Sequence, residues 1–136
     1  MISFAETHAF TPQELELQQR ATQLVSKVNG DFRCHELARA VGKLLGLEAQ
    51  DGWFDMVEHT WLWTKPFKPN PLWAIKRESV PNILDVYVPG SIPQVQLINW
   101  SCYSLPWRRV YYTNPIPRED IQQDVIDQLV TQWSKS

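Results

Sequence analysis

The sequence predicts a single α+β domain over residues 1–136, with two N-terminal helices and a C-terminal helix packed on an antiparallel β-sheet of three to five strands. Two segments ahead of Gly46 carry apolar residues at steps of three and four, which is typical of amphipathic helices. Between residues 56 and 112, apolar and polar residues alternate instead, which is typical of strands. With 43% hydrophobic residues, a chain of 136 residues can bury a core without disulfides.

The overall charge argues against several classes of partner. A net charge of −2 supplies no basic field for nucleic acid or an anionic membrane surface. No apolar run approaches the roughly 18 residues of a membrane span, and residues 1–6 lack the charged-then-apolar pattern of a secretory signal. We therefore expect a cytoplasmic protein without nucleic acid, membrane or cofactor, in which Cys34 and Cys102 stay free thiols. The oligomeric state stays open.

The first helix is expected after a loose arm of residues 1–10, which has no clear period. Thr11 and Glu14 form a capping box around Pro12, which stands at the first helical position. The apolar stripe of this helix ends at Asn29-Gly30 and consists of Leu17, Ala21, Leu24, Val25 and Val28.

The second helix is expected from about Phe32 to Leu45, with Asp31 as its cap and Gly46 ending it. Cys34 stands in its first turn, among unpaired backbone N–H groups and at the positive end of the helix dipole. Both effects favour the thiolate and lower the pKa of a cysteine. This position is therefore suited to a nucleophile.

Two of the predicted strands place polar residues among apolar ones. In residues 56–64, His59 shares a face with Val57, Trp61 and Trp63, while Glu58, Thr60 and Thr64 mark the other face. In residues 82–88, Asp85 shares a face with Ile83 and Tyr87. Between these strands, the proline-rich segment 65–81 is expected to be a long loop and a candidate lid.

The rest of the chain is expected to form two more strands and a helix. The strands are predicted over 94–100 and 108–112, and the helix opens at Pro117 with acidic residues in its first turn. The apolar stripe of this helix comprises Ile121, Val125, Leu129 and Trp133, with Ile126 and Val130 beside it.

His59 and Asp85 are expected to contact each other. Burying an imidazole and a carboxylate on apolar faces costs free energy unless the two groups bond to each other, so neighbouring strands should bring them together. If the two N-terminal helices pack on this face, the second ring nitrogen of His59 meets Cys34. The result is a Cys-His-Asp arrangement suited to acyl transfer.

A cysteine on a helix, a histidine on a strand and an aspartate on the next strand resemble the papain-like fold in its transglutaminase-like form. The resemblance covers about Gly30 to Val88. It implies Cys34 as nucleophile, His59 as general base and acid, and Asp85 as the residue that orients the imidazole. It also implies a small hydrolase or acyltransferase that attacks an amide or thioester carbonyl of a protein or peptide, as a peptidase, deamidase or transglutaminase-like enzyme.

Further residues are candidates for parts of this site. Asn29 is the nearest side-chain amide for an oxyanion, beside the backbone N–H of Cys34. Trp53 and Trp73, in predicted loops flanking the cleft, are candidates for substrate binding.

Two alternatives remain beside the enzyme. A metal site could use Cys34, His35, His59 and Asp85, although adjacent helical residues point about 100° apart and do not easily reach one ion. The other is a non-catalytic accessory domain of the same fold that binds a partner through its proline- and tryptophan-rich loop.

Overall fold

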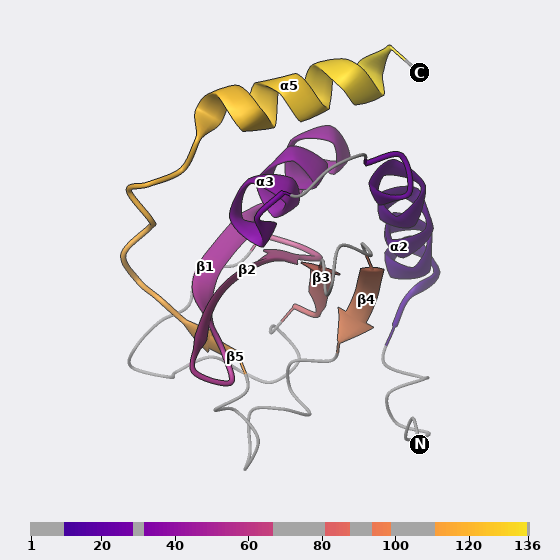
Figure 1. The fold of residues 1–136 in the computed structure, drawn as a ribbon. Coiled ribbons are helices and arrows are strands. Elements are labelled where there is room, and N and C mark those ends of the chain that lie inside the picture. Colours follow the sequence, from indigo (N-terminus) through magenta and orange to yellow (C-terminus); the bar gives the residue numbers. More distant parts are fainter. Residues whose placement is uncertain (1–9, 29–31, 67–80, 88–93, 99–110, 136) are drawn as a thin grey trace.

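The computed structural model describes residues 10–28, 32–66, 81–87, 94–98 and 111–135. Within them the chain forms α2 (Pro12–Val25), α3 (Cys34–Leu45), β1 (Ala49–Phe54), β2 (Val57–Trp63), β3 (Ile83–Tyr87), β4 (Gln94–Ile98), β5 (Tyr111–Thr113) and α5 (Gln123–Ser134) (Figure 1). The predicted α+β class is confirmed. No helix in this part of the chain is long and apolar enough to cross a membrane.

The described strands form one antiparallel sheet in the order β4-β3-β2-β1-β5. Strands β1 and β2 form the central hairpin, in which Ala49 lies opposite Leu62 at one end and Phe54 lies opposite Val57 at the other. Strand β1 also pairs with β5. Strand β2 pairs with β3 at two positions, where Leu62 lies opposite Leu84 and Trp63 opposite Ile83. His59 lies beyond that short pairing, towards the start of β2.

The helices form a layer on one face of the sheet. Helix α3 packs against β2 and β3, α2 lies beside β4, and α5 lies on the outer side of α3 (Figure 1). The fully buried residues of this core come from all three helices and from β2 and β3: Ala21, Val25, Leu37, Ala38, Ala40, Val41, Leu62, Leu84, Val86, Ile126, Leu129 and Trp133.

The face that the helices cover is not the one expected from the sequence. They cover Leu62, Leu84 and Val86, while His59 and Asp85 alternate with these residues and belong to the opposite face. Thr60, expected on a polar face, is fully buried on the helix side. The error arises because β2 is buried on both faces from His59 to Trp63, so its pattern does not show which side the helices occupy.

The opposite face holds a second, aromatic core made of Trp61, Trp63, Ile83 and Tyr111. The rings of Trp61 and Tyr111 meet edge to face, with centroids 5.2 Å apart. Strands β3 and β5 are separated by β2 and β1, which in a flat sheet is about 14 Å. Since the Tyr111 hydroxyl nevertheless reaches Asp85, the sheet is curled around this aromatic core.

The helix boundaries follow the sequence closely at three of the ends. Thr11 caps α2 in the predicted capping box, and Gly46 ends α3 in the left-handed conformation at φ 73°. Helix α2 ends at Val25, ahead of the predicted end at Asn29-Gly30. The prediction of Asp31 as the cap of α3 was wrong: the N-cap residue is Arg33, and its side chain makes no capping hydrogen bond.

The C-terminal helix starts later than expected. Helix α5 begins at Gln123 and not at Pro117. The intervening segment is held by other contacts: the Arg118 guanidinium binds Asp120 and Glu58, and its backbone N–H donates to Asp51.

Strand β1 was not predicted, because Asp51 and Gly52 in its interior are residues that strands disfavour. Parts of the predicted loose arm, of the loop 65–81 and of the strand 108–112 lie outside the described residues, as do Asp31 and Cys102.

Gly52 tests the close approach of β1 and β5. An added methyl group would lie 1.9 Å from the Tyr112 carbonyl oxygen and 2.7 Å from the Trp61 ring. We therefore expect Gly52→Ala to lower the free energy of unfolding by about 2–3 kcal/mol, measured by urea denaturation. Gly46→Ala is the control: its methyl group meets nothing within 4 Å, and only backbone strain of about 1 kcal/mol is expected. A loss at Gly52 no larger than that at Gly46 would contradict this packing.

Candidate functional site

Cys34 is the first residue of α3 and is half-buried. The first backbone hydrogen bond of this turn runs from the Leu37 N–H to the Arg33 carbonyl oxygen, at 3.0 Å. The N–H groups of Cys34 and the next two residues precede that bond, so the thiol lies at the positive end of the helix. This position agrees with the one predicted from the sequence.

Charged side chains hold the first turn of α3 in place. Glu36 is buried, pairs with Arg33 and accepts a hydrogen bond from the Gln122 N–H at 3.1 Å. Burial raises the pKa of Glu36, but the hydrogen bonds from Arg33 and Gln122 outweigh it and keep that pKa below its ordinary value. Arg33 also binds Asp120. The negative charge of Glu36 is therefore compensated close to the thiol.

His59 and Asp85 are in direct contact, as the strand faces predict. The His59 Nε2 atom lies 2.7 Å from Asp85 Oδ1, and the Tyr111 hydroxyl donates to Asp85 Oδ2 at 2.5 Å. Both His59 and Asp85 are more than nine-tenths buried. The carboxylate thus binds the imidazole with one oxygen and the phenol with the other, which fixes the orientation of the ring.

Aromatic rings surround this contact. Phe54, at the end of β1, meets the His59 ring at a steep angle with centroids 6.0 Å apart, and it contacts Tyr111 at 5.0 Å. The centroid of the Trp61 ring lies 6.3 Å from that of the imidazole. These rings exclude water from the His59–Asp85 contact and strengthen it electrostatically.

The thiol and the imidazole stabilise each other's charged forms. Burial raises the pKa of Cys34, but hydrogen bonds with His35 and His59 outweigh burial and lower that pKa to about 6. Burial lowers the pKa of His59, but hydrogen bonds with Asp85 and Cys34 raise it to about 10. Because Asp85 binds Nε2, the nitrogen left to face the thiol is Nδ1. Between these pH values the pair is a thiolate and an imidazolium.

The structure therefore brings Cys34, His59 and Asp85 together, although α3 packs on the other face of the sheet. His59 precedes the part of β2 that pairs with β3. There the thiol of Cys34, in the first turn of α3, shares a hydrogen bond with the imidazole. A thiolate beside an imidazolium that a carboxylate orients is an arrangement able to attack a carbonyl carbon.

The other residues predicted for the site are placed differently. Asn29 and Trp73 lie outside the described residues. Trp53 was expected in a loop but belongs to β1, where it is half-buried and pairs with Glu58 and Tyr112. Those pairs place it on the sheet face opposite His59, because cross-strand partners share a face.

Sequence reasoning missed Tyr111, Thr60 and Asp51 as residues of the site and considered His35 only as a metal ligand. Tyr111 reaches Asp85 only because the sheet curls. His35 Nδ1 lies 3.8 Å from Cys34 Sγ and 2.6 Å from Thr60 Oγ1, and Thr60 donates to Asp51. The sequence holds one signal that could have pointed to this pair: a histidine directly follows Cys34, and a threonine directly follows His59.

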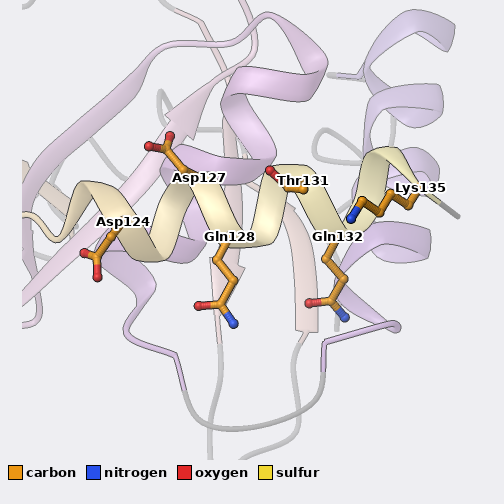
Figure 2. A pocket seen from close by; sticks show the side chains of 6 residues that line it. All are labelled: Asp124, Asp127, Gln128, Thr131, Gln132 and Lys135. Atoms are coloured by element: carbon orange, nitrogen blue, oxygen red, sulfur yellow. The ribbon is translucent and has the colours of Figure 1, made fainter.

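Two further features of the described residues were considered as alternative sites. The open depression on α5 in Figure 2 is formed by polar side chains of that one helix, without a cysteine or histidine: Asp124, Asp127, Gln128, Thr131, Gln132 and Lys135. Among the described residues, no three histidine, cysteine or acidic side chains are grouped so that they could hold a metal ion. The metal site considered from the sequence therefore has no ligand cluster there.

Comparison with known proteins adds no relative: no family model, curated protein or solved structure matches the chain. The function is accordingly inferred from the site itself.

The ionisation of Cys34 tests this geometry. With Cys102→Ser leaving Cys34 as the single thiol, we expect alkylation by iodoacetamide to rise with pH through a pKa of about 6. His59→Gln should move this midpoint upward by more than about one unit, because the imidazolium that stabilises the thiolate is lost.

Thr131→Val, on the exposed surface of α5, is the control and should leave the midpoint unchanged. A thiol with an ordinary pKa, or one indifferent to the His59 substitution, would contradict the contact between Cys34 and His59.

Proposed function

We propose that this protein is a small cysteine hydrolase or acyltransferase that acts on an amide or thioester carbonyl of a protein or peptide. One observation carries the proposal: the half-buried thiol at the start of α3 shares a hydrogen bond with an imidazole that Asp85 holds at 2.7 Å. The arrangement supports the papain-like, transglutaminase-like resemblance suggested by the sequence. A thiolate formed near pH 6 is available in a reducing, cytoplasmic environment.

In the first half of the reaction, the Cys34 thiolate attacks the carbonyl carbon and forms a carbon–sulfur bond. The carbonyl π electrons move to oxygen, and the resulting oxyanion accepts a hydrogen bond from the Cys34 backbone N–H at the start of α3. As the tetrahedral intermediate collapses, the imidazolium of His59 gives its Nδ1 proton to the departing amine or thiol. The product of this half is a thioester on Cys34.

In the second half, neutral His59 takes a proton from a water molecule or an acceptor amine, which attacks the thioester. The carbon–sulfur bond breaks, Cys34 leaves as thiolate, and the imidazolium is restored. Asp85 keeps the ring oriented and stabilises its positive charge in both halves, and Tyr111 holds the carboxylate. Water as acceptor makes the enzyme a hydrolase, and an amine makes it a transferase.

The nucleophile tests the proposal most simply. Peptide amides and peptide thioesters with chromogenic leaving groups provide the assay, and mass spectrometry detects the acyl group on Cys34. We expect Cys34→Ser to lower turnover by at least about 1000-fold, because the serine hydroxyl is not ionised by His59. Its free energy of unfolding should stay within about 1–2 kcal/mol of the wild type.

Cys102→Ser is the matched control and should retain turnover and acylation. Turnover that survives Cys34→Ser, or a wild-type protein that forms no acyl adduct with either substrate class, would overturn the proposed function.

A further inference from the structure

The residues that follow the nucleophile and the base are bonded to each other. His35, directly after Cys34, places its Nδ1 atom 2.6 Å from the hydroxyl of Thr60, which directly follows His59. His35 is 7% exposed and Thr60 is fully buried, so this bond is shielded from water. It links the first turn of α3 to β2 next to the contact between Cys34 and His59.

The direction of the hydrogen bonds in this link follows from proton counting. Hydrogen bonds from Arg39, Thr60 and the Arg118 N–H outweigh burial and keep the pKa of Asp51 below its ordinary value, so its carboxylate only accepts. The single hydroxyl proton of Thr60 is donated to Asp51 Oδ1, at 2.8 Å. Thr60 must therefore accept from His35, whose Nδ1 atom carries a proton.

Arg39 closes the chain of bonds into a ring. Its Nη2 atom lies 2.5 Å from Asp51 Oδ2, and its Nη1 atom donates to the carbonyl oxygen of His35 at 3.0 Å. The ring thus runs from His35 through Thr60, Asp51 and Arg39 back to His35, and it joins α3, β1 and β2. The charges of Arg39 and Asp51 compensate each other, which permits burial of the carboxylate.

The ring places His35 next to the nucleophile with its proton turned to Thr60. The Nδ1 atom of His35 lies 2.6 Å from Thr60 Oγ1 and 3.8 Å from Cys34 Sγ, so the hydroxyl is the nearer acceptor of its single proton. Among the described residues, the titratable groups beside the thiol are His35 and Glu36 from α3 and His59 from β2. Glu36 is neutralised by Arg33, so the imidazolium of His59 is the charged group that stabilises the thiolate.

We propose that the ring of His35, Thr60, Asp51 and Arg39 fixes the first turn of α3 to β2 and thereby positions Cys34 against His59. His35 is in this view a positioning residue for the reaction proposed above, on which the inference rests. Thr60 sets the tautomer of His35, and Asp51 sets the direction of the Thr60 hydroxyl. Without the ring, the first turn of α3 loses its polar link to β2, and Cys34 is no longer held in place against His59.

Thr60→Val tests the proposal, because valine keeps the shape of threonine and removes the hydroxyl. In the Cys102→Ser background, we expect the midpoint of the pH profile for Cys34 alkylation to move upward by about half a unit to one unit, because Cys34 is held less closely to the imidazolium of His59. Thr60→Ser retains the hydroxyl and should restore the wild-type profile. Thr113→Val, at a half-buried position of β5, is the matched control and should not move it.

Urea denaturation shows whether each variant is folded, and His35→Leu provides the same test if Thr60→Val does not fold. In folded variants, an unchanged midpoint, or a downward shift in Thr60→Val caused by the freed Nδ1 proton of His35 binding the sulfur, would overturn the inference, while leaving the proposed function intact. Alkylation needs no turnover. A wild-type protein that shows the expected profile shifts but transfers no acyl group would therefore overturn the proposed function and leave the positioning role standing.

Discussion

The hydrogen bond between His59 and Asp85 is the constraint on which the rest of the structure depends. An imidazole and a carboxylate buried among aromatic rings cost free energy unless each finds a partner, and here they find each other at 2.7 Å. The curl of the sheet brings Tyr111 to the second carboxylate oxygen. The bond occupies one ring nitrogen of His59 and leaves the other for Cys34, so the contact that permits burial also sets which nitrogen faces the thiol.

The sheet separates two polar networks that meet at the first turn of α3. The network of His59, Asp85 and Tyr111 lies on the aromatic face, and the ring that includes His35 and Thr60 lies on the helix face. Because His59 and Thr60 are neighbours on β2, their side chains point to opposite faces. One short helical turn contacts both networks, which explains why so many buried polar groups are concentrated around a single thiol.

Sequence patterns could predict local structure and the contact between His59 and Asp85, but not how the layers assemble. Alternation in two strands placed His59 and Asp85 on one face, and Cys34 was placed at a helix start by periodicity and by Gly46. The prediction of which sheet face the helices cover was wrong, because β2 is buried on both faces. Strand β1 was missed because Asp51 and Gly52 disfavour strands locally, and tertiary contacts compensate for both. These contacts join residues far apart in sequence and depend on the curl of the sheet.

The most direct test of the central claim is the protonation state of the His59 ring, measured by nitrogen NMR on histidine-labelled protein. At a pH of about 8, midway between the pKa values of about 6 for Cys34 and about 10 for His59, the ring should carry protons on both nitrogens. In Cys34→Ser the ring should lose its proton at a lower pH, since the thiolate no longer stabilises the imidazolium. A neutral ring that titrates near the ordinary pKa of histidine, with or without the thiol, would contradict the account.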